Sequence, residues 1–397
     1  MTMQTTRYLI IGGGMVADAA ARGIRERDED GGIVIISDDV DEPYTRPALS
    51  KKLWTDPDFT PEDNYMNTRE DTGATIHLTT EATAVDAEAK TVETTAGTFA
   101  FEKLLLATGG EPKSLDLEEG DRVIVFRTFA DYRRLTELSG RDLDVAVVGG
   151  GFIGTELAAA LAQNSTRTTL LFPDDTLGGS VFPPDLAESF HELYEDRGVT
   201  LIGGTKVSGG RVDGETVELD CGGTTRTFDA AVLGLGLDPL THLAEVAGID
   251  TDDGIVVDES LRTSRPDVFA AGDVASYPDR ILGRQRVEHV DNARNMGAVV
   301  GRIMAGSDET YTHTPYFYTN VFDFGYEAVG TLDSGLSTIE DWQEPQSKGT
   351  VYYLGENDRV QGVLLVNLGE GLDTAREILA EDWPHTREDL IGRLPAE

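Results

Sequence analysis

Short apolar runs alternate with amphipathic stretches along most of the chain, and this alternation predicts strands and helices that follow one another. The N-terminal part has apolar runs at residues 8–11 and 33–36, with an alanine-rich stretch of helical periodicity between them. Such short apolar runs are typical of parallel strands that are buried on both faces. The same order of strand, helix and strand returns between Val145 and Phe172. We therefore expect an α/β protein with two doubly wound domains.

Glycines connect the first apolar run to the helical stretch that follows it. Gly12, Gly14 and Ala17 form the pattern G-x-G-x-x-A. The first glycine permits a sharp turn, the second lets the backbone approach a pyrophosphate, and the small third residue lets helix and strand pack closely. Asp38 follows Ala17 by 21 residues, near the spacing of a carboxylate that binds a ribose hydroxyl, and Asp39 is adjacent. The segment is predicted to bind a dinucleotide, and the alternative is a structural turn in another α/β protein.

A second glycine motif opens the repeat of this pattern, and here G-x-G-x-x-G is complete. The motif consists of Gly149, Gly150, Gly151, Phe152, Ile153 and Gly154. We expect a helix over residues 155–163, with Asp174 at the ribose position, 20 residues after Gly154. No arginine lies between Phe172 and Ser180 to hold a 2′-phosphate, so NADH is expected rather than NADPH. Two such motifs predict two bound dinucleotides.

Composition limits the kind of protein and its partners. The 397 residues include 72 acidic and 33 basic side chains, a net charge of −39, which disfavours nucleic acid and anionic membranes as partners. The acidic residues are spread along the chain, which favours adaptation to high salt over an acidic interaction tail, because the Debye length falls to ~3 Å at ~1 M salt and screens the repulsion. No apolar run approaches the ~18 residues that span a bilayer, and the polar N-terminus shows no signal peptide. We expect a cytoplasmic protein.

Cys221 is the sole cysteine, and it lies in an alternating, strand-like stretch. A single cysteine forms neither an internal disulfide nor a redox-active dithiol pair. We therefore interpret Cys221 as a structural residue and expect no metal site.

Several further segments resemble one family. PYTRPALSK at residues 43–51 resembles the PYxRPxLSK segment of ferredoxin-reductase-like enzymes. The other matching segments are KLLLATGG at 103–110, LFPD at 171–174, VFAAGD at 268–273 and GYEAVG at 325–330. The chain is identified as a member of the FAD-dependent pyridine nucleotide oxidoreductases, in the branch that resembles ferredoxin reductases and apoptosis-inducing factor. The resemblance extends from Tyr8 to about Ala380.

This resemblance implies contacts with FAD beyond the first glycine motif. The implied residues are Arg46, Lys51, Arg127, Gly272, Asp273, Glu288, His289 and Tyr318. Asp273 would bind the ribityl chain, and Tyr318 would stand near the flavin in place of a family tryptophan. His289 is expected at the start of a helix against the flavin ring rather than as a proton donor, since hydride transfer needs no proton relay. Without the resemblance, we would interpret Arg46 and Arg127 as cations on the surface and Tyr318 as an aromatic residue of the core.

The resemblance also implies the nicotinamide side and a catalytic pair. Gly236 would lie near the nicotinamide, and Glu327 near bound NAD. Lys51 and Glu156, from opposite nucleotide domains, would pair beside the flavin and stabilise negative charge on its reduced form. The alternative for Glu156 is a carboxylate in the first turn of a helix, where the dipole favours it by ~0.3–1 kcal/mol.

Three domains follow from the resemblance. They are an FAD-binding domain of residues 1–111 and 240–312, an NAD(H)-binding domain of 112–239, and a C-terminal α+β interface domain of 313–397. We expect hydride transfer from NADH to FAD, with electrons passing to a ferredoxin- or rubredoxin-like protein, a quinone or a small oxidant. The alternative is a slow redox sensor that resembles apoptosis-inducing factor, in which a charge-transfer complex with NADH changes the oligomeric state. A homodimer is compatible with either function.

Overall fold

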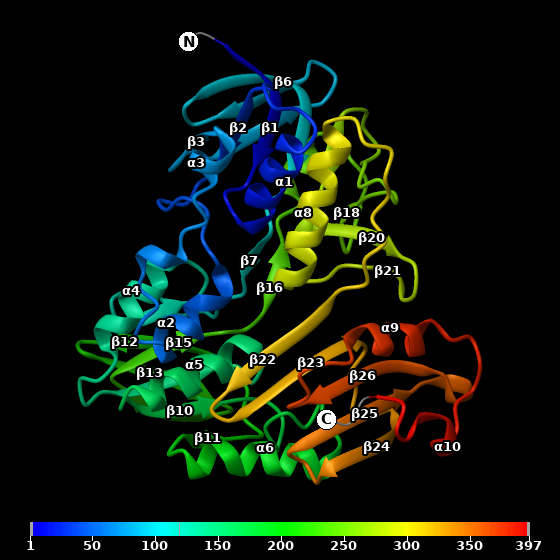
Figure 1. Cartoon of the computed structure of the whole chain (residues 1–397). Helices are drawn as coiled ribbons and strands as arrows, with labels where there is room; N and C mark the ends of the chain where they lie inside the picture. Colours follow the sequence, from blue (N-terminus) through cyan, green and yellow to red (C-terminus); the bar gives the residue numbers. More distant parts are fainter. Residues whose placement is uncertain (1–2, 119, 395–397) are drawn as a thin grey trace. The chain divides into compact units, whose positions relative to one another are not determined.

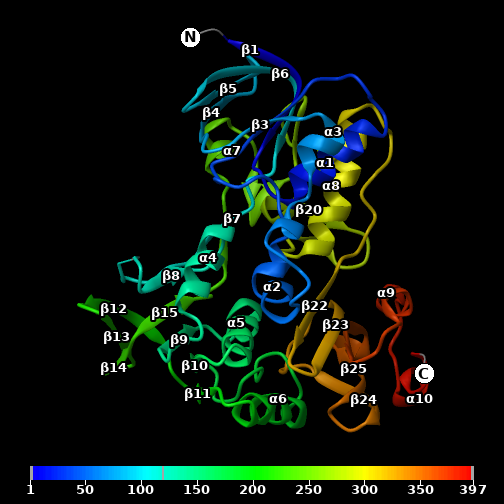
Figure 2. The same cartoon turned by 60° about the vertical axis from the view of Figure 1, so that its left-hand side comes forward.

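The computed structural model describes residues 3–118 and 120–394, and the chain divides into two compact units. Unit 1 contains the residues up to Arg46, Phe59–Glu111 and Asp238–Pro315. Unit 2 contains Pro47–Asp58, Pro112–Leu237 and the residues from Tyr316 onward. Each unit has a parallel sheet with helices packed on it (Figures 1 and 2), which confirms the predicted α/β class. The finer division into three domains stays a prediction.

A seven-stranded sheet forms the centre of unit 1, in the order β3-β2-β1-β6-β5-β4, with β19 also paired to β6. Its strands are β1 (Gln4–Ile11), β2 (Ile33–Ile36), β3 (Thr75–His77), β4 (Ala82–Asp86), β5 (Thr91–Thr94), β6 (Gly97–Leu106) and β19 (Val268–Ala270). The long strand β6 pairs antiparallel with β5 through its first half and parallel with β19 through its second half. The antiparallel strands β4 and β5 therefore extend the central sheet, because β6 belongs to both parts.

Helices α1 (Met15–Arg25) and α8 (Val290–Met304) lie side by side in unit 1 (Figure 1). Small residues permit this close packing. A Cβ atom at Gly301 would lie 2.2 Å from the carbonyl oxygen of Ala20, and one at Gly297 would lie 2.8 Å from the Cβ of Ala19. The crossing of the two helices therefore requires glycine on α8.

Shorter elements complete unit 1. The helical ones are η2 (Glu62–Asn64), α3 (Thr68–Thr72), α7 (His242–Val246) and η3 (Gly272–Val274). A four-stranded sheet consists of β17 (Thr251–Asp252), β18 (Gly254–Val256), β20 (Ala275–Asp279) and β21 (Gly283–Gln285). The chain passes between the units five times: at η1 (Arg46–Leu49), after Asp58, through the paired strands β7 (Gly110–Pro112) and β16 (Leu237–Pro239), and after Pro315.

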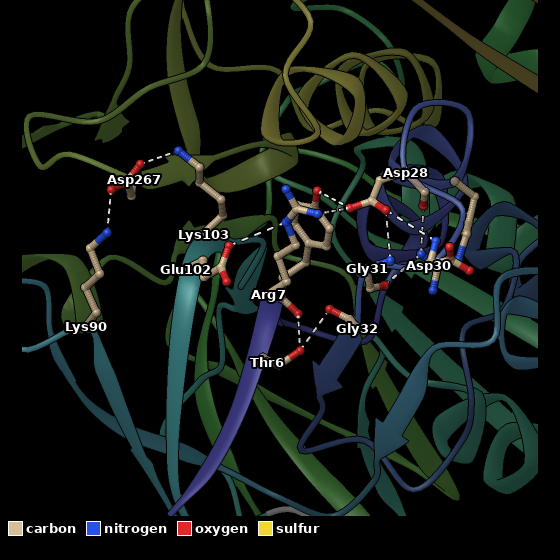
Figure 3. A network of polar contacts seen from close by, with 12 residues as sticks. Thr6, Arg7, Asp28, Asp30, Gly31, Gly32, Lys90, Glu102, Lys103 and Asp267 are labelled. Atoms are coloured by element: carbon tan, nitrogen blue, oxygen red, sulfur yellow. Dashed lines mark hydrogen bonds and ion pairs between the residues drawn. The ribbon is translucent and has the colours of Figure 1, made fainter.

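Two carboxylates connect distant segments of unit 1 (Figure 3). Asp28, which follows α1, accepts hydrogen bonds from Arg7 and from the Tyr8 hydroxyl, both at 2.8 Å. The Tyr8 hydrogen bond, with help from backbone N–H groups, lowers the pKa of Asp28, while burial and the same hydrogen bond raise the pKa of Tyr8 to about 12. Asp267, just before β19, forms ion pairs with Lys90 and Lys103. The ion pairs of Asp267 join the segment Asp238–Pro315 to the segment Phe59–Glu111.

A five-stranded parallel sheet forms the first part of unit 2, in the order β11-β10-β9-β15-β8. Its strands are β8 (Val123–Val125), β9 (Asp144–Val148), β10 (Arg167–Leu171), β11 (Thr200–Ile202) and β15 (Ala230–Leu233). Its helices are α2 (Lys52–Thr55), α4 (Phe129–Leu138), α5 (Phe152–Gln163) and α6 (Pro184–Asp196). An antiparallel sheet of β12 (Val207–Asp213), β13 (Thr216–Cys221) and β14 (Thr224–Phe228) follows α6. Cys221 is buried there among apolar side chains, as expected for a structural residue.

A five-stranded antiparallel sheet forms the C-terminal part of unit 2, in the order β22-β23-β26-β25-β24. Its strands are β22 (Tyr316–Val321), β23 (Phe324–Gly330), β24 (Ser337–Glu344), β25 (Lys348–Leu354) and β26 (Val360–Val366). The turn η4 (Glu356–Asp358) joins β25 to β26, and α9 (Leu372–Ala380) and α10 (Arg387–Leu390) end the described chain. The C-terminal residues thus combine an antiparallel sheet with two short helices.

Throughout residues 3–118 and 120–394, every helix is too short or too polar to cross a bilayer.

Candidate functional site

The first glycine motif forms the turn between β1 and α1, as predicted. Gly12 has a φ of +110°, and a Cβ there would lie 2.1 Å from the carbonyl oxygen of Ala107, so both conformation and space require glycine. Gly14 is the N-cap of α1, and no side chain caps this end of the helix. A Cβ at Gly14 would meet no described atom within 4 Å. Because no side chain caps this end, the first N–H groups of α1 can donate to a phosphate of a dinucleotide, and Gly14 leaves room beside them.

The acidic segment after β2 distinguishes two candidate ribose ligands. Asp39 accepts hydrogen bonds from the Tyr44 hydroxyl at 2.9 Å and from the Asp41 N–H at 3.1 Å. Asp38 is exposed, and its carboxylate has no hydrogen bond or ion pair with a described residue. The guanidinium of Arg46 lies over the Tyr44 ring, 5.3 Å from its centroid. Asp38 is therefore better placed than Asp39 to bind a ribose hydroxyl.

The segment Asp238–Pro315 of unit 1 contributes further predicted FAD residues. Gly272 has a φ of +80°, and a Cβ there would lie 2.4 Å from Val16 of α1. Asp273 follows it in η3. His289 is the N-cap of α8, and its Nδ1 accepts a hydrogen bond from the Asp291 N–H at 3.3 Å. This places His289 at the start of a helix, as predicted, with Nδ1 acting as an acceptor.

One further predicted FAD residue of unit 1, Glu288, already has a partner. Its carboxylate accepts a hydrogen bond from the Arg286 guanidinium at 2.6 Å, and Arg286 also binds Asp253 at 2.8 Å. A contact from Glu288 to a cofactor would thus have to compete with Arg286.

The second glycine motif forms the turn between β9 and α5 in unit 2. Gly149 has a φ of +116°, and a Cβ there would lie 2.3 Å from the carbonyl oxygen of Gly234. A Cβ at Gly154 would lie 1.8 Å from the carbonyl oxygen of Gly149, so the turn closes tightly on the helix. A Cβ at Gly151, the uncapped N-cap of α5, would meet no described atom within 4 Å. This second helix end is open in the same way as the first.

The start of α5 corrects one expectation. The helix begins at Phe152, three residues before the predicted start, because the last residues of the glycine motif form its first turn. Glu156 therefore lies in the second turn, where the helix dipole contributes little. The dipole no longer explains a carboxylate at this position.

The remaining predicted NAD residues of unit 2 differ in how available they are. Asp174 is partly exposed, and its carboxylate has no hydrogen bond or ion pair with a described residue. Phe152 and Ile153 are 43% and 40% exposed at the open end of α5. Gly236 has a φ of +87° and is also exposed. These residues leave polar and apolar groups free around one helix end.

Lys51 and Glu156 are brought together within unit 2. The distance from Lys51 Nζ to Glu156 Oε1 is 2.7 Å, and the two side chains are 19% and 2% exposed. Two hydroxyls bind the same carboxylate: Ser50 Oγ donates to Oε2 at 2.5 Å, and Thr319 Oγ1 donates to Oε1 at 2.7 Å. Lys51 Nζ also lies 5.4 Å from the centroid of the Tyr318 ring. Glu156 is thus the centre of a buried polar cluster made by three separate segments.

The segment that carries Lys51 belongs to unit 2. The predicted boundaries of the FAD domain stay a prediction, and Pro47–Asp58 groups with unit 2 in the division into two compact units. The reason is its packing on α4 and α5: the Tyr132 hydroxyl donates to the Leu53 carbonyl at 3.2 Å, and Asn164 donates to that of Trp54 at 3.3 Å. The two members of the pair therefore belong to one compact unit, not to opposite ones.

Glu327 and Arg127 complete the predicted set. Glu327 of β23 stands opposite Tyr318 of β22 in the antiparallel register. Burial raises the pKa of Glu327, and the charge of Arg376 offsets this in part. Arg127 follows β8, and its backbone N–H donates to Asp131 at 3.1 Å.

Ser50 and Thr319 are the two site residues that the sequence reasoning missed. The available signal was adjacency, because Ser50 precedes Lys51 in the matched PYTRPALSK segment and Thr319 follows Tyr318. Among the described residues, no group of three or more His, Cys, Asp or Glu side chains is placed to hold a metal ion.

Two glycine turns at uncapped helix ends, each followed by an acidic residue at the spacing of the dinucleotide motif, are the features of a protein that binds two dinucleotides. The sequence model of the family described as pyridine nucleotide-disulphide oxidoreductase matches residues 6–297. The chain belongs to this family. It is an NAD(P)H oxidoreductase with FAD and NAD(H) as cofactors, and its single cysteine separates it from the members that react through a dithiol pair.

Relatives of two kinds are similar over nearly the whole chain. Mitochondrial apoptosis-inducing factor 1 of Dictyostelium discoideum is 33% identical, with 97% of this chain and 80% of that protein covered. The ferredoxin–NAD(+) reductase component of the anthranilate 1,2-dioxygenase system of Burkholderia cepacia is 32% identical, with 95% of each covered. A chain in the solved covalent putidaredoxin reductase–putidaredoxin complex is 28% identical, with a TM-score of 0.86 and 94% and 93% coverage. These matches confirm the family resemblance.

Proposed function

We propose that this protein transfers electrons from NADH through FAD to a ferredoxin-type protein. The observation that carries the proposal is the pair of open glycine turns, one in each unit, in a chain that matches a ferredoxin–NAD(+) reductase over 95% of both lengths. Two dinucleotides are what a reductase of this kind requires. The lack of a second cysteine means that the electrons do not pass through a disulfide of the enzyme.

The residues of unit 1 fit FAD. The N–H groups at Gly14 and the start of α1 would bind its phosphates, and Asp38 would accept hydrogen bonds from its ribose. Gly272 and Asp273 lie beyond the end of β19, in the motif that resembles the family's ribityl-binding segment. When bound, FAD supplies a ring that accepts a hydride from NADH and returns electrons to an acceptor.

The residues of unit 2 fit NADH. The N–H groups at Gly151 and the start of α5 would bind the pyrophosphate, and Asp174 would accept hydrogen bonds from the ribose of the adenosine. A carboxylate at this position repels the 2′-phosphate of NADPH, so we expect NADH to bind more tightly. Phe152 and Ile153 would provide apolar contact.

Lys51 and Glu156 would act on the flavin as a pair. The buried carboxylate holds the ammonium group of Lys51 at 2.7 Å, so the lysine side chain is ordered. An ordered cation near the flavin would stabilise the negative charge that reduction creates. The pair would therefore raise both the rate and the driving force of reduction.

The similarity to apoptosis-inducing factor supports a second candidate function, a slow redox sensor. In a sensor, NADH would leave a long-lived reduced complex and change the oligomeric state, whereas a reductase would return rapidly to its oxidised form. A homodimer, a cytoplasmic location and adaptation to high salt are further parts of the proposal, which gel filtration, fractionation and salt titration would test.

Anaerobic stopped-flow absorbance with FAD-loaded protein in 2 M KCl tests the function. We expect NADH to bleach the flavin band faster than NADPH at equal concentration, and a [2Fe–2S] ferredoxin to reoxidise the reduced protein within the time of one turnover. A reduced protein with a persistent long-wavelength band, unchanged by ferredoxin, would favour the sensor. Loaded protein that NADH does not reduce would contradict both functions.

A matched pair of variants tests the NADH site. Asp174→Ala should raise the Kd for NADH by about 10-fold, the effect of losing roughly 1.4 kcal/mol of hydrogen bonding. Asp175→Ala removes the neighbouring exposed carboxylate and should leave the Kd within about 2-fold. Equal effects of the two substitutions would mean that the ribose binds elsewhere.

A further inference from the structure

Two hydroxyl groups complete the surroundings of Glu156, and the family resemblance assigned no role to either. Glu156, Ser50 and Thr319 are 3%, 3% and 2% exposed, so all three are removed from water. Ser50 Oγ donates to Oε2 at 2.5 Å, whereas Thr319 Oγ1 and Lys51 Nζ both donate to Oε1 at 2.7 Å. Each carboxylate oxygen therefore has a donor, and without Ser50 the oxygen Oε2 would lose the donor that the structure gives it.

Burial makes these hydrogen bonds costly to lose. A carboxylate without partners in a protein interior is strongly destabilising, and a hydrogen bond to a buried charge is costlier to break than one between neutral groups. If Lys51 were its only donor, the carboxylate group of Glu156 would also be free to rotate about its last side-chain torsion. Three donors from two segments, Ser50 with Lys51 and Thr319, determine both the position and the orientation of the carboxylate, and through it the position of the Lys51 ammonium.

The hydroxyls of Ser50 and Thr319 belong to residues next to Lys51 and Tyr318 in the chain. Ser50 immediately precedes Lys51 in the turn between η1 and α2, and both side chains reach the same carboxylate. Thr319 follows Tyr318, whose ring lies 5.4 Å from Lys51 Nζ. Neighbouring residues on an extended strand point to opposite faces, so Thr319 reaches Glu156 from the other face of β22. The cluster therefore couples two backbone segments to one charge.

We infer that Ser50 and Thr319 are positioning residues for electron transfer, whose hydroxyls hold Glu156 in the orientation that orders Lys51. This inference rests on the proposed function, in which the ordered ammonium stabilises the reduced flavin. Loss of either hydroxyl lets the Glu156 carboxylate and the Lys51 ammonium shift from these positions. Reduction of the flavin by NADH then becomes slower, and the midpoint potential of the flavin becomes more negative. The binding of NADH, which uses α5 and Asp174, stays unchanged.

Two substitutions at Thr319 separate a role in hydrogen bonding from a role in packing. Thr319→Val keeps the shape of the side chain and removes the hydroxyl, whereas Thr319→Ser keeps the hydroxyl and removes a methyl group. In anaerobic stopped flow with NADH, the limiting rate of flavin reduction should fall about 10-fold in Thr319→Val and stay within about 2-fold in Thr319→Ser. A packing role predicts the opposite order, with the serine variant the slower of the two.

Ser50→Ala tests the second hydroxyl independently, and it decides the question if Thr319→Val does not fold. It too should lower the limiting rate by about 10-fold with the Kd for NADH within about 2-fold. In a Glu156→Gln background, Thr319→Val should lose most of its effect, because the hydroxyl acts through the carboxylate. Thr350→Val, an equally buried threonine in the same sheet, should behave as wild type.

A second readout does not depend on turnover. The midpoint potential of the bound flavin, measured by equilibrium titration against a redox dye, should be more negative in Thr319→Val and Ser50→Ala than in wild type and Thr319→Ser. Wild-type rates and potentials in both hydroxyl-free variants would overturn the inference alone. A wild-type protein that binds FAD but is not reduced by NADH would overturn the proposed function, and this inference with it.

Discussion

At the scale of single residues, Glu381 shows how one carboxylate gains several partners. Arg393 donates to its two oxygens at 2.7 and 2.8 Å, and His385 Nε2 lies 2.7 Å from one of them. The hydrogen bonds from Arg393, followed by that from His385, lower the pKa of Glu381 to about 2, against the opposing effect of burial. The cluster connects the end of α9 to the residues after α10 and makes the C-terminal segment sensitive to pH.

The pH dependence of this contribution has a definite sign. The folded pKa of about 2 lies below the ordinary value of 4.5, so the unfolded chain binds the proton more tightly. The stabilisation is fully present above about pH 4.5 and is lost as the pH falls toward 2. Glu381→Gln should lower Tm at pH 7 by roughly 2–4 °C, the shift expected for ~1 kcal/mol in a unit of this size, and the difference from wild type should shrink below pH 4.5.

Thermal unfolding followed by circular dichroism at several pH values measures this effect. Glu370→Gln is the control, since it removes the same charge from an exposed side chain that has no hydrogen bond or ion pair with a described residue. A difference in Tm between Glu381→Gln and wild type that stays constant from pH 7 to pH 3 would contradict the assignment.

At the scale of elements, the packing of α1 on α8 decides where the first glycine motif lies. Gly23 of α1 approaches the carbonyl of Ala298, and Gly297 and Gly301 of α8 approach the backbone of α1. Because α1 begins at the glycine turn, its position sets the place of the N–H groups proposed to bind phosphate. Packing far from the site therefore contributes to its geometry.

Gly301→Ala tests this contact. In an open helix, replacing glycine by alanine stabilises by about 1 kcal/mol, but here the new Cβ would lie 2.2 Å from the carbonyl oxygen of Ala20. We expect a net destabilisation of roughly 1–3 kcal/mol, because neither backbone can move without separating the helices.

Denaturant unfolding measures the change, with Gly32→Ala as the control. At Gly32, the nearest atom to a new Cβ would be the Thr6 hydroxyl oxygen at 3.4 Å, so that variant should stay within about 0.5 kcal/mol of wild type. Equal or greater stability of Gly301→Ala would show that the helices separate easily.

At the scale of the whole molecule, the net charge of −39 dominates the long-range electrostatics. Like charges repel one another across the folded surface and destabilise the compact state. Salt weakens this repulsion, since the Debye length falls from about 10 Å at 0.1 M to about 3 Å at 1 M. Stability should therefore depend strongly on ionic strength.

We expect Tm to rise with KCl, mostly between 0.1 and 1 M, and to change little above that range. Scanning calorimetry in a KCl series at pH 7 measures this dependence, and sucrose at matching osmolarity controls for effects that are not electrostatic. A Tm that is independent of KCl, or that falls, would show that local ion pairs such as those of Asp267 outweigh the general repulsion.

Much of the nucleotide-binding framework could be predicted from the sequence. The turns at Gly12 and Gly149 were found in advance, since the glycine motif, the strand before it and the helix after it are contiguous in the chain. The start of α5 was placed three residues late, because a glycine-rich motif lowers the apparent helical signal of a turn that is in fact helical.

The choice between neighbouring acidic residues required the structure. Asp38 and Asp39 have the same chemistry, and spacing does not separate them. The Tyr44 hydroxyl and the Asp41 N–H donate to the Asp39 carboxylate, whereas the Asp38 carboxylate has no partner among the described residues.

Local patterns alone determined that the chain has two strand–turn–helix units. They also determined that it belongs with enzymes that bind two dinucleotides, and that no dithiol pair of the enzyme carries electrons. These features depend on residues within about one turn or strand of each other. The partners of Glu156 were decided by the tertiary structure, because Ser50 and Lys51 lie 106 and 105 residues before it and Thr319 lies 163 residues after it. A buried charge must satisfy its hydrogen bonds with whatever donors the fold brings to it, and folding alone selected these two hydroxyls.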